Sequence, residues 1–259
     1  YECCPLLLNS YAKRLLLTGW QFWGMTIFVT MSYHTAKPLA ERILYEDNHL
    51  IAINKLPGEI VQGDKTGDEP LSEALKCYLK ERDRKPGNVF VGVPHRLDRP
   101  VSGICLFAKT SKGLGRMNGL FHDGAMHKTY LALVIEKPSV PVATLTHYLT
   151  RNEKQNKSFA WDTPREGAKE AKLRYTYLRS TLKYHLLEIE LLTGRHHQIR
   201  CQLAAIGLHI KGDLKYGAPR SNPDGGISLH AYRLEFVHPI RQEPVVITAP
   251  WDPWITDEK

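Results

Sequence analysis

The sequence predicts an α+β domain built on a large, mainly antiparallel mixed sheet flanked by helices and loops. Three observations favour this class. Many strand-like runs lie close together in the chain, as antiparallel neighbours do. The helical segments interrupt these runs without the regular alternation of a βαβ protein. Finally, the 259 residues are 42% hydrophobic, which is enough to bury one large core.

The strands are expected where short runs are rich in β-branched and aromatic residues or alternate in polarity. The first two of these runs are separated by a tight turn and predict a hairpin. The polar segment 151–174, mixed in charge, predicts a solvated loop or hairpin rather than a dedicated binding arm. The predicted strands are 43–45, 50–53, 89–93, 104–108, 127–135, 175–180, 185–192, 229–236 and 245–248.

Helices are expected where apolar residues recur every three or four positions. One such helix opens at 70–73 and ends at the breaker 82–87, and a second covers 114–121 and stops at Gly124. A third follows Thr193-Gly194 and carries Ile199 and Leu203 on one side. Packed on a sheet, these amphipathic segments would supply the helical layers of the fold.

The sequence predicts one domain over 41–255, because no linker divides it. Residues 1–40 are expected to be an extension that is disordered or is upstream sequence foreign to the native protein, with a biological start at Met25 or Met31. Their apolar part resembles a signal peptide poorly, since polar residues and glycines break it and no small-x-small cleavage site follows. No other segment is a candidate membrane span.

Charge and cysteine content narrow the function classes. Lys and Arg outnumber Asp and Glu by 35 to 27, giving a net charge of +8 that suits a polyanionic partner. Cys77, Cys105 and Cys201 fall in apolar patterns without metal-type spacing, so we expect reduced core residues of a cytoplasmic protein. A disordered chain is excluded.

The segment HRLDRPVSG, residues 95–103, holds one carboxylate among cations between two predicted strands. Connections between strands often display functional groups, so Asp98 is a candidate for chemistry. A simpler interpretation is a turn, because Asp followed closely by Pro is common loop chemistry. Other segments of the chain favour the functional interpretation.

Three separated segments together resemble the motifs of a known family: HRLDRPVSG, KTYLALV and TGRHHQIR. Two further segments belong to the same pattern, INKLPG upstream and HIKGDLKYG downstream. In this order and spacing they resemble the RluA-type family of pseudouridine synthases over about 41–250. The resemblance implies the family's catalytic domain, with Asp98 as the catalytic aspartate and Tyr130 and Arg200 in support. Val101 and His196 depart from the residues usual in the family's motifs, but neither is one of these three positions.

The resemblance implies a role for each of the three residues. Asp98 would act as nucleophile at C1′ of a uridine or assist elimination there, and the sequence leaves both mechanisms open. Arg200 would pair with Asp98 and keep it ionised, because an adjacent cation lowers a carboxylate pKa by roughly 1 to 3 units. Tyr130 would stack on the uracil and could move a proton.

Further residues are candidates for binding the substrate. In the family, the arginine before the catalytic aspartate fills the space left by the flipped base, a role that would pass to Arg96. Surface cations are candidates for phosphate contacts, although most surface lysines are only solvated. The substrate-binding candidates are Arg96, His95, Ile199, Arg195, His197 and Lys55, with Lys109, Lys112, Arg116 and Lys128 as possible backbone contacts.

No cofactor and no metal are expected. His95, His197 and His209 lack the spacing of a helical zinc site and no cysteine pair accompanies them, so we expect them to bind backbone groups around the pocket. The isomerisation itself involves no redox change and needs no Lewis acid.

The sequence thus predicts an isomerase acting on a uridine in structured RNA, a tRNA or rRNA stem-loop, as a monomer without an obligate protein partner. Extrusion of the target base from its stack would cost a few kcal/mol. An RNA-binding or RNA-folding module with secondary or no catalysis is the alternative. A glycoside hydrolase is disfavoured, because such enzymes use two carboxylates and the HRLDRPVSG segment has one. Which RNA and which uridine are selected is left open.

Overall fold

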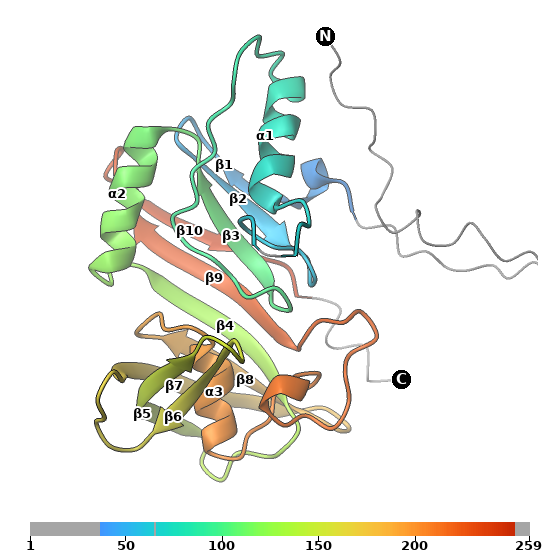
Figure 1. The fold of residues 1–259 in the computed structure, drawn as a ribbon, viewed down its shortest axis with the longest axis vertical. Helices are drawn as coiled ribbons and strands as arrows, with labels where there is room; N and C mark the ends of the chain where they lie inside the picture. The colour runs from blue at the N-terminus through green and yellow to red at the C-terminus, as the bar shows by residue number, and fades with distance from the viewer. Residues whose placement is uncertain (1–36, 65, 252–259) are drawn as a thin grey trace, which may run out of the picture. The chain divides into compact units, whose positions relative to one another are not determined.

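A computed structural model describes residues 37–64 and 66–251 of the chain. Ten strands, three α-helices and two short 3-10 helices form this part (Figure 1). In chain order they are η2 (Leu39–Arg42), β1 (Ile43–Glu46), β2 (Leu50–Lys55), α1 (Leu71–Arg82), β3 (Ser102–Ala108), α2 (Ser111–His122), β4 (His127–Val134), β5 (Val142–Asn152), β6 (Lys157–Trp161), β7 (Lys169–Ser180), β8 (His185–Leu191), α3 (Gln198–Ala205), η3 (Leu214–Tyr216), β9 (Leu229–Val237) and β10 (Pro244–Thr248).

The ten strands form one sheet in the order β1-β2-β3-β9-β4-β8-β7-β5-β6, with β10 paired to β9. Among the described strands only β3 and β9 run parallel, through Ser102 opposite His230 and Gly103 opposite Ala231. All other pairs are antiparallel. The predicted mainly antiparallel mixed sheet is therefore confirmed.

Helices α1 and α2 pack on opposite faces of the upper part of the sheet in Figure 1. Alternate residues of β3 explain this arrangement: Cys105 and Phe107 join the core under α1, whereas Ile104 and Leu106 join the core under α2. Because both faces are covered, β3 is buried at every position. The strand that follows the Asp98 segment is thus a rigid, central element.

Helix α3 packs on the lower part of the sheet, formed by β4, β8, β7, β5 and β6 (Figure 1). Ile199 and Leu203 of α3 join a buried cluster with side chains of β4, β7 and β8. The side of the predicted helix that carries these two residues is therefore the packed side. The loop before β3 and the start of α3 are in contact, through the hydrogen bond between Asp98 and Arg200.

One prediction about strands needs correction. Residues 89–93 do not form a strand, because only Gly92 makes a bridge, to Ala108. Leu114 packs so closely on Gly92 that a Cβ there would lie 2.8 Å from it, and Pro94 follows without a donor for a ladder. The polar segment 151–174 forms a hairpin, one of the two expected alternatives: β6 pairs antiparallel with β5, which ends in this segment, and lies at the edge of the sheet.

The cysteine prediction holds for two of the three residues. Cys105 and Cys201 are buried, whereas Cys77 is exposed and the expectation of a core position is wrong. Cys77 lies on α1 between the positions that pack on the sheet, namely Leu75 and Leu79. A helix with a narrow apolar side places such an intervening residue toward solvent.

Residues 1–36, which make up nearly all of the predicted N-terminal extension, lie outside the described residues. The same holds for the proposed starts at Met25 and Met31. Within the described ranges, no helix is long and apolar enough to cross a membrane.

Candidate active site

The Asp98 loop rests on a buried lysine. Lys55, at the end of β2, is fully buried and its Nζ donates to the carbonyls of Leu56 and Arg99 at 3.0 Å each and of Val101 at 2.6 Å. Burial lowers the pKa of Lys55 to about 8, so the ammonium is still protonated at neutral pH. The expected contact of Lys55 with substrate is therefore wrong, because the side chain supports the loop from within the protein.

The end of the loop is fixed where β3 begins. Gly103 has φ of +108°, and a Cβ at this position would lie 2.4 Å from the carbonyl oxygen of Ala231. Only glycine lets the two parallel strands approach this closely. Beside it, the Ser102 hydroxyl is 2.8 Å from Nδ1 of the buried His230. The Ser-Gly pair of the HRLDRPVSG segment thus anchors the loop that carries Asp98.

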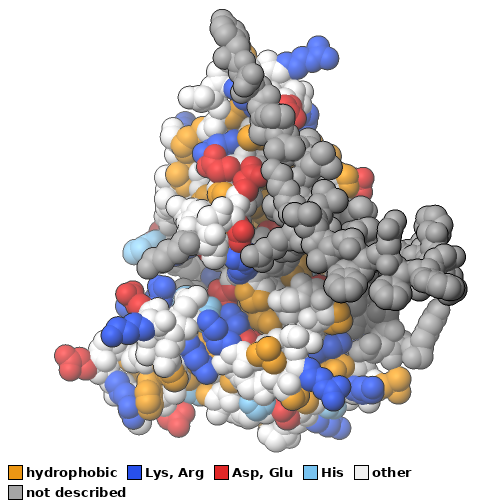
Figure 2. All heavy atoms as spheres, turned by 45° about the vertical axis from the view of Figure 1, so that its right-hand side comes forward, with side chains coloured by type: hydrophobic (Ala, Val, Ile, Leu, Met, Phe, Trp, Pro, Cys, Tyr) orange, Lys and Arg blue, Asp and Glu red, His pale blue; other side chains and the backbone are white. Residues whose placement is uncertain are grey.

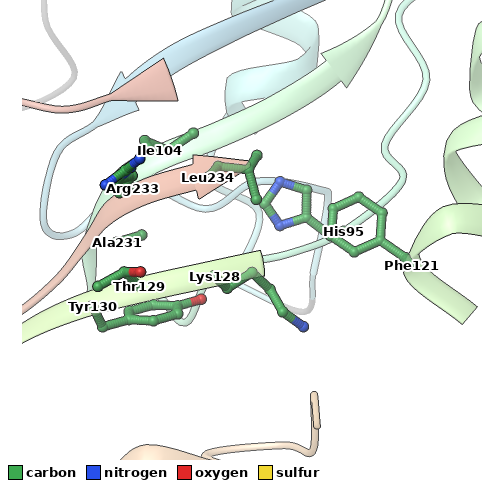
Figure 3. A pocket seen from close by; sticks show the side chains of 9 residues that line it. All are labelled: His95, Ile104, Phe121, Lys128, Thr129, Tyr130, Ala231, Arg233 and Leu234. Carbon is green, nitrogen blue, oxygen red and sulfur yellow. The ribbon is translucent and has the colours of Figure 1, made fainter. Parts of the chain in front are cut away.

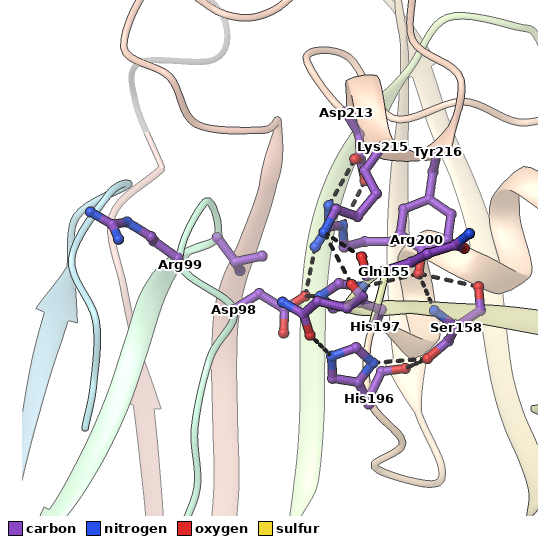
Figure 4. A network of polar contacts seen from close by, with 12 residues as sticks. Asp98, Arg99, Gln155, Ser158, His196, His197, Arg200, Asp213, Lys215 and Tyr216 are labelled. Atoms are coloured by element: carbon purple, nitrogen blue, oxygen red, sulfur yellow. Dashed lines mark hydrogen bonds and ion pairs between the residues drawn. The ribbon is translucent and has the colours of Figure 1, made fainter. Parts of the chain in front are cut away.

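Asp98 and Arg200 form the predicted pair across 102 residues of sequence (Figure 4). Nη1 of Arg200 donates to Oδ2 of Asp98 at 3.0 Å. The same guanidinium donates through Nε and Nη2 to the two oxygens of Asp213, at 2.6 and 2.8 Å. Burial opposes the charge of Arg200, but Asp213 and Asp98 together raise its pKa above the ordinary value. Arg200 is therefore a fixed cation between two carboxylates.

Helix α3 presents two side chains to Asp98. His197 precedes the helix and Arg200 lies three residues later, so both point to the same side. Nε2 of His197 lies 3.5 Å from Oδ2 of Asp98, and its Nδ1 lies 3.0 Å from the Tyr216 hydroxyl. Burial and the charge of Arg200 lower the pKa of His197 to about 2, so the ring is neutral.

The turn before α3 is held by one amide side chain. Oε1 of Gln198 accepts from the Thr193 hydroxyl at 2.8 Å and from the Arg195 backbone N–H at 2.9 Å. Its Nε2 donates to the Lys172 carbonyl of β7 at 3.0 Å. These bonds fix the TGRHHQIR segment on the sheet, and so fix where Arg200 points.

Tyr130 lies on β4 and lines a small pocket together with eight other residues (Figure 3). Burial raises the pKa of Tyr130, and the negative charge of Asp98 raises it further. The hydroxyl therefore stays protonated at neutral pH. Figure 3 shows Tyr130 and Lys128 on the same side of β4. The other lining residues are His95, Ile104, Phe121, Lys128, Thr129, Ala231, Arg233 and Leu234.

The histidines behave differently from one another. Nε2 of His95 accepts from the Leu106 backbone N–H at 2.9 Å, as predicted, and the ring stacks on Phe121. Burial and the nearby Lys128 lower the pKa of His95 to about 4. The prediction of backbone partners is wrong for the other two rings, because His197 contacts Tyr216 and Asp98, and the ring of His209 pairs with the Glu136 carboxylate at 2.8 Å.

The remaining binding candidates are spread around the site. Arg96 is exposed beside Asp98, whereas Ile199 is 5% exposed and packs in the core. Arg195 is exposed and its Nε donates to the Glu170 carbonyl at 3.0 Å. Figure 2 shows Lys and Arg side chains gathered on the lower half of one face of the molecule. A basic surface of this kind suits an anionic polymer.

Sequence reasoning missed Asp213 and Tyr216, which hold Arg200 and His197. Both belong to the HIKGDLKYG segment, so the motif itself was a signal that this part of the chain reaches the site. Their partners became visible only in the folded chain. Among the residues that the structure describes, no group of three or more His, Cys, Asp or Glu side chains could hold a metal ion.

The arrangement supplies one carboxylate that is free to react. Oδ2 of Asp98 is bound by Arg200, while no described residue donates a hydrogen bond to Oδ1. The second carboxylate nearby, that of Asp213, is 2% exposed and is committed to Arg200. Hydrolytic glycosidases place two accessible carboxylates around the bond they cleave. The site instead suits a single carboxylate acting as nucleophile or base.

Comparison with known proteins identifies the family of this chain. The model of the RNA pseudouridylate synthase family matches residues 49–205. Ribosomal large subunit pseudouridine synthase D of Xylella fastidiosa is 34% identical over 226 residues, which cover 80% of this chain and 65% of that protein. The tRNA pseudouridine synthase C of Pectobacterium carotovorum is 30% identical over 241 residues, covering 86% and 62%.

A solved structure shows the same fold. The human RNA pseudouridylate synthase domain containing 4 superimposes with a TM-score of 0.71 at 22% identity, covering 85% of this chain and 92% of that one. The chain belongs to the RluA-type family of RNA pseudouridylate synthases. It spans 62 to 66% of the length of the first three curated relatives.

Proposed function

We propose that this chain converts a specific uridine in a structured RNA to pseudouridine. The observation that carries the proposal is the state of Asp98, which is held through Oδ2 by Arg200 while Oδ1 is left without a partner among the described residues. The isomerisation breaks the bond from N1 to C1′, rotates the uracil and forms a bond from C5 to C1′. The proton lost from C5 is balanced by one gained at N1, so neither an oxidant nor a reductant is consumed.

Asp98 acts at C1′ in this proposal, either by adding to it or by assisting elimination at the neighbouring carbon. Both routes use the carboxylate of Asp98, which the guanidinium of Arg200 holds and orients through Oδ2. Covalent catalysis by a carboxylate divides a difficult glycosidic cleavage into two easier steps. The geometry serves either route equally.

Tyr130 contacts the uracil in the same proposal. Its ring lines the pocket and offers a flat apolar surface for stacking, and its protonated hydroxyl is available to exchange a proton as C5 becomes bonded. The charge of Asp98 contributes to the raised pKa of Tyr130, which supports a location of the two side chains at one site.

The target uridine has to leave its stack to reach Asp98. The exposed Arg96 lies two positions before Asp98, where a guanidinium can stack in the space that the flipped base leaves. Loop uridines make extrusion cheaper, so a stem-loop is the expected target. Relatives named for tRNA and for the large ribosomal subunit are similarly close, and either RNA class is a candidate substrate.

Pseudouridine mapping of total RNA tests this function. RNA from source cells with the gene is compared with RNA from cells that lack it, and the gene is then restored. Loss of one pseudouridine on deletion, with return on restoration, identifies both the activity and the substrate. An unchanged map would overturn the proposal and favour an RNA-binding or RNA-folding module, which would then retain affinity for RNA without altering any uridine.

A further inference from the structure

His197 adopts a backbone conformation that its residue type rarely takes. Its φ of 52° lies in the left-handed region, and it precedes α3 without capping the helix through its side chain. A non-glycine residue in this region is strained, and such strain persists where the surroundings enforce it. The conformation points the ring at Asp98, with Nε2 3.5 Å from Oδ2.

The Tyr216 hydroxyl is held at the outer edge of β6. It accepts a hydrogen bond from the Ser158 backbone N–H at 2.9 Å. Its own hydrogen then has two possible acceptors, the Ser158 carbonyl at 3.3 Å and Nδ1 of His197 at 3.0 Å. The shorter of the two contacts is the one to His197.

The tautomer of His197 follows from these contacts. A neutral imidazole carries one N–H, and its other nitrogen accepts. If Nδ1 held the hydrogen, the lone pair of Nε2 would face the negative oxygen of Asp98. If Nδ1 accepts from Tyr216, Nε2 carries the hydrogen and presents it to Oδ2 of Asp98. Electrostatics and the hydrogen-bond inventory both favour the second arrangement.

We propose that His197 is a positioning residue for Asp98, held by Tyr216 as the tautomer with hydrogen on Nε2. This inference rests on the proposed function and deepens it. Oδ2 then faces N–H groups of both Arg200, at 3.0 Å, and His197, at 3.5 Å, so rotation of the carboxylate is disfavoured and Oδ1 is the oxygen left to react. The tyrosine acts through His197 and does not touch the substrate.

The surroundings of His197 support positioning rather than proton transfer. The His196 ring stacks on it with centroids 3.8 Å apart, and His196 is itself held by the Ser158 hydroxyl and by Asn156. Enclosure and the adjacent guanidinium of Arg200 disfavour a second proton on the ring. A histidine fixed in this way can donate one hydrogen bond but is a poor acid-base catalyst.

Nitrogen NMR of the 15N-labelled full chain at pH 7 tests the tautomer directly. The signals of His197 are assigned by their loss in His197→Asn, a variant that tolerates the left-handed backbone. We expect a protonated Nε2 and a hydrogen-bonded, unprotonated Nδ1, with a mixture of tautomers in Tyr216→Phe and no change in Tyr175→Phe, a buried control tyrosine. A native ring protonated on Nδ1 would overturn the proposal.

Steady-state kinetics of pseudouridine formation test whether Tyr216 and His197 position Asp98 for the reaction. The substrate is an unmodified transcript of the RNA identified by mapping. We expect Tyr216→Phe to lower kcat about tenfold with KM unchanged, as for loss of one hydrogen bond to a charged group. His197→Asn should lose at least as much, and the double variant should be no slower than His197→Asn alone. Native kcat in Tyr216→Phe, or losses that multiply, would overturn the proposal. If the native chain forms no pseudouridine, the proposed function fails, while the spectra still decide the tautomer.

Discussion

The buried carboxylate of Asp213 accepts two hydrogen bonds from the guanidinium of Arg200, at 2.6 and 2.8 Å, and leaves one nitrogen for Asp98. A planar guanidinium has the fixed fork that can serve both carboxylates at once. The charge of Arg200 is therefore shared between the buried Asp213 and Asp98, the carboxylate proposed to react. This division explains how Asp98 is held while one of its oxygens is left open.

Arg200→Lys should lower the rate of pseudouridine formation at the mapped uridine by about 100-fold or more. A single ammonium cannot make the fork to Asp213 and also reach Asp98, so one buried carboxylate loses its partner. The rate is measured on the transcript used above. Arg84→Lys, at an exposed arginine that follows α1, is the control and should keep a near-native rate. A native rate in Arg200→Lys would show that the fork is dispensable.

Tyr130→Phe removes the hydroxyl of Tyr130 and keeps its ring, so it distinguishes the contributions of the two groups. The ring stays in the pocket, so RNA affinity measured by fluorescence anisotropy should match the native chain, while kcat falls by roughly 100-fold as expected for loss of a proton-transfer group. Tyr130→Ala should lose affinity as well, because the stacking surface is gone. Full activity in the phenylalanine variant would remove the hydroxyl from the reaction.

Lys55→Met should lower the free energy of unfolding by roughly 1–3 kcal/mol in urea titrations. The Val101 carbonyl loses its donor, whereas the carbonyls of Leu56 and Arg99 keep a backbone N–H, and one unsatisfied buried polar group costs about 1–3 kcal/mol. Lys76→Met, on the exposed side of α1 where the lysine pairs with Glu73, should change stability by less than about 0.5 kcal/mol. Equal stability of the two variants would contradict the supporting role of Lys55.

Acid should destabilise the fold between pH 6.5 and 4 through His95 and His230. Burial lowers the pKa of each to about 4, below the ordinary 6.5, so the unfolded chain binds protons in this window and the folded chain does not. The free energy of unfolding therefore falls as pH falls, by about 1–3 kcal/mol for each group. Urea titrations at pH 7 and 5 measure the loss.

His95→Gln should flatten that pH dependence, whereas His122→Gln should leave it unchanged, since the His122 side chain is 88% exposed. The glutamine variant removes the buried titrating ring, so its own stability at pH 7 can be lower while its slope with pH decreases. A slope identical to that of the native chain would exclude His95 as a source of the acid sensitivity.

The sequence predicted most strands and all three helices, because these elements have strong local periodicity. It missed β5, although buried and exposed positions alternate along this strand, and it left open whether 151–174 is a loop or the hairpin that contains β6. The run 89–93 has strand-forming residues, but Leu114 and Pro94 leave room for only one bridge, at Gly92. Local composition does not reveal which partner a strand will find.

The pairing of Asp98 with Arg200 could be predicted, since both lie in motifs whose relation is known from the family. The roles of Asp213 and Tyr216 could not, because their partners are brought near only by folding. Lys55 was misjudged for a related reason. A lysine next to a loop motif suggests a surface contact, and only burial shows that its three donors are used inside the protein.

The most direct measurement of the central claim compares native chain, Asp98→Asn and Asp68→Asn on the mapped RNA in a single assay. Asp68 is an exposed aspartate that pairs with Arg99 beside the same loop, so it controls for loss of a nearby charge. We predict pseudouridine formation by the native chain and by Asp68→Asn, and none by Asp98→Asn, with unchanged RNA binding in all three. Pseudouridine formed by Asp98→Asn at the native rate would contradict the assignment of Asp98 as the reacting carboxylate.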